Sequence, residues 1–444
     1  MYSQTISKFL KEHKISIGDI VKVNVKGITE ECELMPSTEA NDENIIIVKL
    51  KNGYNIGINF KEAKISRVAK GKPYGEFPKV ALKYKEGLPK VKLVYTGGTI
   101  GSKVDYKTGG VYMLTKPEEL LYEVPELSEI AQIRVHDFLH VASEDMSSED
   151  WGKIAREVGT ALNDGFKGVI VTMGTDTMHY TASALSFMLK GLNAPVVVTG
   201  AQRSPDRGSS DAFLNLICSA HIAAKSDIAE VGICMHYSSS DDKCAFIRGT
   251  RARKMHTSRR DAFRAINSRP LAFVDSKGEI TYNEIYRKLR KNVRSKVEIA
   301  TGFERKVALI KAYPNSDPEI IDFYINKDYK GLIIEGTGLG HTPALTEKKD
   351  ASWLGHIKNA TDSGMIVGMT SQCLYGRVNS MVYRTLRLLS SAGVIYCEDM
   401  LPETAYIKLG WLLGNYREEK AMKLLTENLV GEISSRSEYN EFLI

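Results

Sequence analysis

Two short threonine-containing segments each follow an apolar, strand-like run. The first, Tyr-Thr-Gly-Gly-Thr-Ile-Gly-Ser at residues 95–102, has adjacent glycines that let the backbone turn sharply and present Thr99 just beyond the turn. The second, Met-Gly-Thr-Asp-Thr-Met at residues 173–178, runs into a helix-like segment, so Thr175 and Asp176 are expected near a helix N-terminus. Taken singly, the first loop also fits a plain strand-to-helix turn or a phosphate loop, and the second an ordinary helix cap.

The threonine hydroxyls are candidate nucleophiles, because the sequence lacks the motifs of several other hydrolases. Cleavage of a carboxamide requires a nucleophile, a base and donors for the developing oxyanion. The chain has no G-x-S-x-G elbow and no H-E-x-x-H motif, and its histidines lie outside the two threonine loops, except His179 just after the second. A serine–histidine system is therefore not expected.

The elements that must position these loops follow residue 90. Apolar strand-like runs there alternate with helix-length amphipathic segments, which predicts a parallel sheet with crossover helices. Loops at the carboxyl ends of such strands form the substrate site. We predict an α/β catalytic domain at residues 91–275, a charged linker at 276–304, and a smaller α/β domain with terminal helices at 305–444.

A separate β module is expected before this sheet. Residues 16–68 alternate β-rich runs with turn signals, and Asn52-Gly53 predicts a hairpin turn. The following stretch carries Pro73, Pro78 and Pro89 among lysines and glycines, as in an extended connector. We place a small, barrel-like all-β module at residues 1–75 and a linker at 76–90.

Composition excludes several classes of protein. A chain of 444 residues with 43% hydrophobic residues can bury two or three cores. It contains no apolar run of about 18 residues, and its N-terminal segment lacks a signal-peptide core, so we expect no membrane association and a cytoplasmic location. Its six cysteines form no C-x-x-C pair, so neither a disulfide framework nor a metal site is expected. The net charge of +6 does not by itself identify an anionic partner.

The two threonine loops together resemble the paired signatures of the L-asparaginase and glutaminase family. Further matches occur in the same order after residue 90: A-S-E-D-M at 142–146, T-G-A-Q-R at 199–203, R-G-T-R-A-R-K at 248–254 and P-E-T-A at 402–405. The resemblance implies an α/β fold of asparaginase-like, two-domain, parallel-sheet architecture, preceded here by a small SH3-like all-β module.

The same resemblance implies catalytic roles. Thr99 and Thr175 would face each other across the substrate amide, one attacking and the other assisting. Asp176 and Lys254 match the family's base arrangement, in which a lysine desolvated near an acid relays a proton. Two further catalytic candidates, each with an alternative, are Tyr112, for which Tyr106 in the same loop could substitute, and Glu403, which could instead be a helix N-terminal charge.

Substrate-binding residues also follow from the resemblance. Ser143 and Glu144 would bind the α-carboxylate and amino end of the substrate. The family typically has aspartate at the position of Glu144 and histidine at that of Met173, so glutamine and asparagine both remain candidate substrates. The full set implied to bind substrate is Gly98, Ser143, Glu144, Gly174, Ala201 and Gln202.

Residues 1–90 and the variant M-G-T-D-T-M-H-Y-T resemble one branch of the family, the D subunits of archaeal Glu-tRNA(Gln) amidotransferases. Membership would imply ammonia release to the amidotransferase E subunit, which would bind ATP and Mg and most of the Glu-tRNA(Gln). This chain would hold no cofactor and would form a homodimer within a heterotetramer. The alternatives are a free cytosolic L-asparaginase, and an RNA-binding module on an inactive α/β scaffold.

The arginine-rich stretch at residues 248–264 suggests how activity could be coupled to a partner. Only Asp261 opposes its arginines within the stretch, so a solvated basic loop is an alternative interpretation of Lys254. We expect self-repulsion to keep the loop mobile until an acidic or RNA surface neutralises it. The arginines assigned to this coupling are Arg251, Arg253, Arg259 and Arg260.

Overall fold

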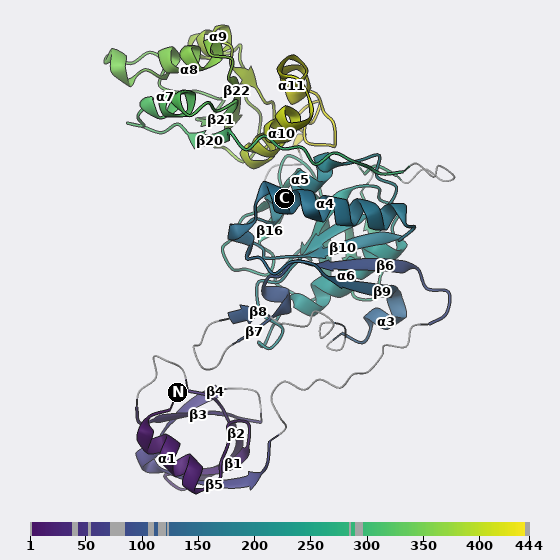
Figure 1. Ribbon diagram of the computed structural model, residues 1–444, viewed down its shortest axis with the longest axis vertical. Coiled ribbons are helices and arrows are strands. Elements are labelled where there is room, and N and C mark those ends of the chain that lie inside the picture. The colour runs from purple at the N-terminus through teal and green to yellow at the C-terminus, as the bar shows by residue number, and fades with distance from the viewer. Residues whose placement is uncertain are drawn as a thin grey trace.

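The chain folds into three units, which a computed structural model describes over residues 2–37, 43–51, 55–71, 85–104, 111–113, 121, 124–283, 286–288 and 296–439. Figure 1 shows a small β unit at one end, a large α/β unit in the middle and a smaller α/β unit at the other end. Within those ranges, no helix has the length and apolar character needed to cross a membrane.

The N-terminal unit is an antiparallel sheet in the order β4-β3-β2-β1-β5, with one helix packed against it. That helix begins after Ser3, whose hydroxyl accepts the Ile6 N–H, and the all-β prediction missed it because only Ile6 and Leu10 are buried along it. Asn52 and Gly53 lie outside the described residues, but the strands flanking them pair antiparallel, as a hairpin requires. The elements are α1 (Gln4–Glu12), β1 (Ile20–Val25), β2 (Ile28–Leu34), β3 (Ile45–Lys49), β4 (Asn55–Asn59), the 3-10 helix η1 (Phe60–Glu62) and β5 (Ala63–Ala69).

The middle unit is built on an eight-stranded sheet in the order β18-β17-β14-β13-β12-β10-β6-β9. Its five strands from β13 to β9 are parallel, whereas β14, β17 and β18 continue it antiparallel, so the sheet is mixed. Strand β10 is buried at every residue, as expected where helices cover both faces. The strands are β6 (Lys90–Tyr95), β9 (Gln132–Asp137), β10 (Gly168–Thr172), β12 (Val196–Thr199), β13 (Val231–His236), β14 (Lys243–Arg248), β17 (Ala272–Asp275) and β18 (Ile280–Tyr282).

Helices cover this sheet on two sides. The first layer, α4 (Ser148–Asn163) and α5 (Met178–Met188), shares one apolar cluster with the sheet, and the second layer, α3 (Leu127–Ile130) and α6 (Ala212–Lys225), shares another. Short strand pairs and 3-10 turns complete the unit. These are β7 (Ser102–Val104) with β8 (Val111–Met113), β11 (Leu189–Lys190) with β19 (Glu298–Ile299), β15 (Ala252–Lys254) with β16 (Phe263–Ala265), η2 (Thr99–Gly101) and η3 (Ser143–Asp145).

The C-terminal unit is a four-stranded parallel sheet in the order β20-β21-β22-β23. Helices α7, α8 and α9 share an apolar cluster with it, whereas α10 lies between the two α/β units, where its Trp411 ring stacks on Phe187 of α5 at a centroid distance of 5.6 Å. The elements are β20 (Val307–Lys311), α7 (Glu319–Asn326), β21 (Gly331–Gly336), η4 (Lys349–Ala351), α8 (Trp353–Asp362), β22 (Ile366–Ser371), α9 (Arg384–Ser391), β23 (Ile395–Tyr396), α10 (Pro402–Asn415) and α11 (Glu418–Leu425).

The sheet of the middle unit extends past the predicted domain end at residue 275. That position closes β17, and β18 pairs with it as the next strand of the same sheet. Within the predicted linker at 276–304, β19 also pairs with β11. These strands are two or three residues long, so their charged sequence carries no usable periodicity.

Candidate active site

The two threonine loops meet because the strands that carry them are neighbours. Strand β6 pairs parallel with β10, with Tyr95 opposite Thr172 at their carboxyl ends. Hydrogen bonding between the two segments continues one residue beyond β6, because the Thr96 N–H and hydroxyl both donate to the Thr172 carbonyl, at 3.0 and 2.9 Å. Thr99 and Thr175 therefore leave the same edge of the sheet.

Glycines allow these loops to interlock. Gly98 has a φ of +90°, and a Cβ at that position would lie 2.3 Å from the Gly174 N. A Cβ on Gly174 would in turn lie 2.8 Å from the Ser143 Oγ. Larger residues at either position would push the two loops, or the loop carrying Ser143, apart.

Lys254 joins the second threonine loop from the β15–β16 hairpin. Its Nζ donates to the Thr175 Oγ1 at 2.8 Å and pairs with the Asp176 Oδ1 at 2.6 Å. The Lys254 side chain is 10% exposed, whereas that of Asp176 is 66% exposed, so the lysine is held inward beneath an acid that reaches solvent. A lysine in contact with both a hydroxyl and a carboxylate can relay a proton between them.

An open cavity of about 390 Å³ lies over these groups. Nine of the twelve residues assigned to the site from the sequence line it, which brings both threonines, Asp176 and Lys254 to one space. Four lining residues were not assigned from the sequence: Ser102, Ala142, Thr257 and Ser258. The cavity is lined by Gly98, Thr99, Ser102, Ala142, Ser143, Glu144, Gly174, Thr175, Asp176, Gln202, Lys254, Thr257 and Ser258.

Of the other assigned residues, Ala201 and Glu403 do not line the cavity, and Tyr112 is only partly described. Ala201 is fully buried beside the cavity. Tyr112 lies on β8, opposite Lys103 of β7, but its side chain is outside the described part of the structure, as is the whole of Tyr106. Glu403 belongs to the first turn of α10.

Glu403 forms an ion pair with Arg253 outside the cavity lining. Its carboxylate pairs with Arg253 at 2.9 Å, and its side chain is 8% exposed. Burial raises the pKa of Glu403, and the charge of Arg253 opposes that rise. Because Arg253 and Lys254 are consecutive in a strand, their side chains point to opposite faces, toward α10 and the cavity respectively.

The other arginines near Lys254 are also paired, so the expectation of a loop kept mobile by self-repulsion is wrong. Arg251 and Asp399, both 1% exposed, are 3.0 Å apart, and Arg260 lies 2.6 Å from Asp241. The remaining pairs are Arg248 with Glu230, Arg259 with Asp261, and Arg264 with Asp261. Three of these four acids lie outside residues 248–264.

His179 lies just after the Thr175 loop and is shielded from solvent. Burial, followed by the charges of Arg253 and Lys254, lowers its pKa to about 3. The imidazole is therefore neutral at neutral pH and adds no positive charge beside Lys254. Among the described residues, no group of three or more histidine, cysteine, aspartate or glutamate side chains is placed to hold a metal ion.

Comparison with known proteins agrees with this geometry. The model for the asparaginase N-terminal domain matches residues 90–286, the glutaminase/asparaginase C-terminal domain matches residues 306–425, and the GatD N-terminal domain matches residues 15–68. The thermostable L-asparaginase from Thermococcus kodakarensis superposes with a TM-score of 0.69 at 29% identity, covering 78% of this chain and 99% of that one. The chain belongs to the asparaginase family.

Full-length relatives define its place within that family more narrowly. The D subunit of glutamyl-tRNA(Gln) amidotransferase from Pyrococcus abyssi is 47% identical over 446 residues, covering 99% of both chains. The protein of the same name from Pyrococcus furiosus is 48% identical over 447 residues, covering 99% of this chain and 100% of its own length. This chain groups with those D subunits over its whole length, the N-terminal β unit included.

Proposed function

We propose that this chain is the glutaminase subunit of a Glu-tRNA(Gln) amidotransferase and releases ammonia from the side-chain amide of glutamine or asparagine. The observation that carries the proposal is the contact of Lys254 Nζ with both Thr175 Oγ1 and Asp176 Oδ1, in a cavity that Thr99 also lines. The names of the full-length relatives support the amidotransferase role.

Hydrolysis would proceed through a threonine ester. A threonine Oγ attacks the amide carbon, and its proton is relayed through the Lys254 Nζ to the Asp176 carboxylate. The tetrahedral intermediate expels its nitrogen, which takes up a proton and leaves as ammonia. Water then attacks the ester carbon, releasing the carboxylic acid and restoring the threonine hydroxyl. Thr175 has the direct proton route, and Thr99 supplies the second hydroxyl of the same cavity.

The cavity suits an amide that carries an α-amino acid group. Glu144 and Asp176 both line it, and their carboxylates would attract an α-ammonium group. Ser143 presents its hydroxyl 3.3 Å from the Glu144 Oε2, where it can donate to an α-carboxylate or to Glu144. Glutamine and asparagine both carry these groups, and they differ by one methylene in the distance to the amide.

The ammonia would be used by a partner. The sequence contains no G-x-x-x-x-G-K-[ST] phosphate loop, and we propose that an E subunit binds ATP and Mg, activates the tRNA-bound glutamate and receives the ammonia. Glu-tRNA(Gln) would be held mainly by that partner, in a cytoplasmic heterotetramer built on a homodimer of this chain. A glutaminase that worked without an acceptor would waste glutamine, so the isolated chain should have low glutaminase activity.

The decisive assay measures ammonia release from glutamine and from asparagine, by the chain alone and with the E subunit, ATP and Glu-tRNA(Gln). We expect slow release by the chain alone and a large rise when all components are present. Uncharged tRNA(Gln) serves as the matched control, because it offers no acceptor glutamate. Full activity without a partner would instead support a free asparaginase, the activity named for the structural relative from Thermococcus kodakarensis.

A further inference from the structure

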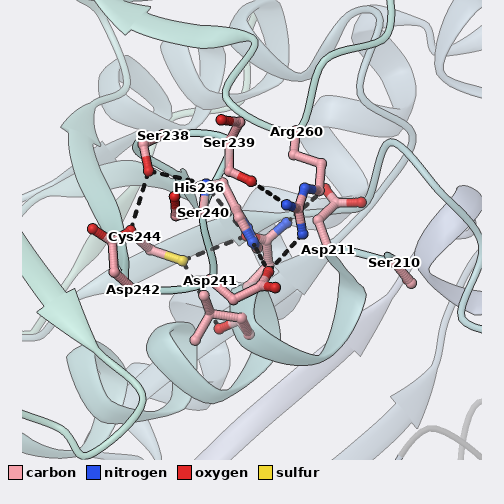
Figure 2. A network of polar contacts seen from close by, with 12 residues as sticks. Ser210, Asp211, His236, Ser238, Ser239, Ser240, Asp241, Asp242, Cys244 and Arg260 are labelled. Atoms are coloured by element: carbon pink, nitrogen blue, oxygen red, sulfur yellow. Dashed lines mark hydrogen bonds and ion pairs between the residues drawn. The ribbon is translucent and has the colours of Figure 1, made fainter. Parts of the chain in front are cut away.

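A buried histidine lies between two hydrogen-bond acceptors close to the cavity. His236 ends β13, and its side chain is fully buried. Its Nδ1 lies 2.6 Å from the Asn215 Oδ1, and its Nε2 lies 3.1 Å from the Asp241 Oδ1. Figure 2 shows His236, Asp241 and Arg260 within one connected set of polar contacts.

The orientation of Asn215 is fixed by its other contacts. Its amide nitrogen donates to the Gly200 carbonyl and to Asp211, each at 3.0 Å. Its oxygen accepts the backbone N–H of His236 at 3.0 Å. Rotating the amide by 180° would set donors against donors, so the atom that faces the His236 Nδ1 is an oxygen and can only accept.

The second acceptor is a carboxylate held in its ionised form. Arg260 pairs with Asp241 at 2.6 Å, and the hydrogen bond from His236, ahead of the charge of Arg260, lowers the pKa of Asp241. Each ring nitrogen of His236 therefore faces an oxygen that can only accept a hydrogen bond. Only the imidazolium carries a proton on both nitrogens.

Other groups near the ring contact the same acceptors but do not replace the protons on the ring nitrogens. Asp211, at the start of α6, is an acceptor for backbone N–H groups, and Cys244 of β14 directs its thiol toward the same Asn215 oxygen at 3.5 Å. Arg260, which belongs to the same set of contacts, donates to Asp241 and to the Ser239 carbonyl. Both ring nitrogens of His236 thus face atoms that can only accept, so each nitrogen must carry a proton to keep its contact.

This set of contacts joins two walls of the cavity. At one end, Asp211 accepts the backbone N–H of Gln202 at 3.0 Å, and Gln202 lines the cavity. At the other end, Arg260 belongs to the segment at residues 255–261, which follows Lys254 and supplies Thr257 and Ser258 to the lining of the same cavity. His236 is the link between them, through Asn215 on one side and Asp241 on the other.

We infer that His236, as an imidazolium, is a positioning residue for amide hydrolysis: it clamps the segment at 255–261 to the Gln202 wall through Asp241 and Arg260. The inference rests on the proposed function. Loss of either proton from His236 removes one of its two contacts, frees Arg260 to move, and widens the cavity around the substrate. Substrate affinity is then lost before the chemical step is affected.

The test compares His236→Gln and Asp241→Asn with the matched control Asp242→Asn. Asp242 accepts from the Ser238 hydroxyl and the Lys243 N–H, so its replacement removes a neighbouring acid without touching His236. The assay is ammonia release from glutamine by the full chain with the E subunit and Glu-tRNA(Gln). We expect KM to rise on the order of tenfold in both test variants, with kcat changed less, because a wall of the cavity is misplaced while the chemical groups remain.

Two features separate this role from a general structural one. The variant carrying both changes should be no worse than either single variant, because both break one chain of contacts. Because the clamp needs a proton on each ring nitrogen, the wild-type KM should rise as the pH is raised, and this rise should be absent from His236→Gln. Independent losses in the double variant, or the same pH profile in His236→Gln, would overturn the inference.

Hydrogen exchange keeps the inference separate from the proposed function. Backbone amides at residues 255–261 should exchange faster in His236→Gln and Asp241→Asn than in the wild type. Their exchange rates should be unchanged in Asp242→Asn. If the wild-type complex releases no ammonia, the proposed function fails, while this exchange pattern still reports whether the clamp exists. Unchanged exchange in both test variants would show that no clamp exists.

Discussion

Replacement of Lys254 by methionine tests the proton route at the site. The change keeps the length and the apolar stem of the side chain but removes Nζ, with its contacts to the Thr175 hydroxyl and to Asp176. Losing positioned acid–base help costs about a hundredfold in rate, or roughly 2.7 kcal/mol of transition-state stabilisation. Stability should change little, because Asp176 is largely exposed and remains solvated without its partner.

The assay for Lys254→Met is steady-state ammonia release from glutamine in the presence of the E subunit and Glu-tRNA(Gln), with thermal unfolding measured in parallel. We expect kcat to fall about a hundredfold while KM changes little, because the lysine acts on the reacting hydroxyl. Arg259→Met is the matched control, since it removes a cation from the same hairpin, where Arg264 still pairs with Asp261. A variant with unchanged kcat would refute the proton route and make Lys254 a solvated basic residue.

Three further predictions address the backbone, acid stability and the domain junction. Gly98→Ala should lower kcat/KM about a hundredfold with normal circular dichroism, because its Cβ would lie 2.3 Å from the Gly174 N; near-normal kinetics would contradict the interlocked loops. Since the pKa of His179 is lowered to about 3, folding favours the neutral imidazole, and the stability of the protein falls as the pH drops below about 6.5. The urea midpoint should therefore fall less between pH 7 and pH 5 in His179→Gln than in the wild type. Equal falls in the two proteins would contradict this role of His179. Lys408→Met should reduce the free energy of unfolding by about 3–5 kcal/mol, because it leaves Glu432 buried without its cation at 2.7 Å; a loss below about 1 kcal/mol in urea unfolding would contradict this.

Local sequence is enough to locate most of the cavity. The T-G-G-T and G-T-D-T segments each follow an apolar run, and parallel strands place such loops at one edge of a sheet. Thr99, Thr175, Asp176 and Lys254 are assigned together through the family resemblance of their motifs, and all four line one cavity. Thr257 and Ser258 were missed, although both hydroxyl residues follow Lys254 closely in the sequence.

Pairing between distant segments is beyond what the sequence indicates. The acids that neutralise Arg251, Arg253 and Arg260 come from residues 399, 403 and 241, on other elements, and no local spacing indicates them. The same limit applies to the antiparallel half of the large sheet, because strand direction depends on tertiary packing rather than on periodicity. The prediction of a mobile arginine-rich stretch fails for this reason, since its charges are satisfied within the fold.

The central claim is that two threonine hydroxyls in one cavity cleave an amide, and the most direct test is ammonia release by Thr99→Ala and Thr175→Val. Both variants should be measured in the complete complex with glutamine, with circular dichroism to confirm that the fold is retained. We predict that each substitution abolishes release, because each removes a hydroxyl from the cavity wall. Retention of more than a few per cent of wild-type activity by both variants would contradict the two-threonine account.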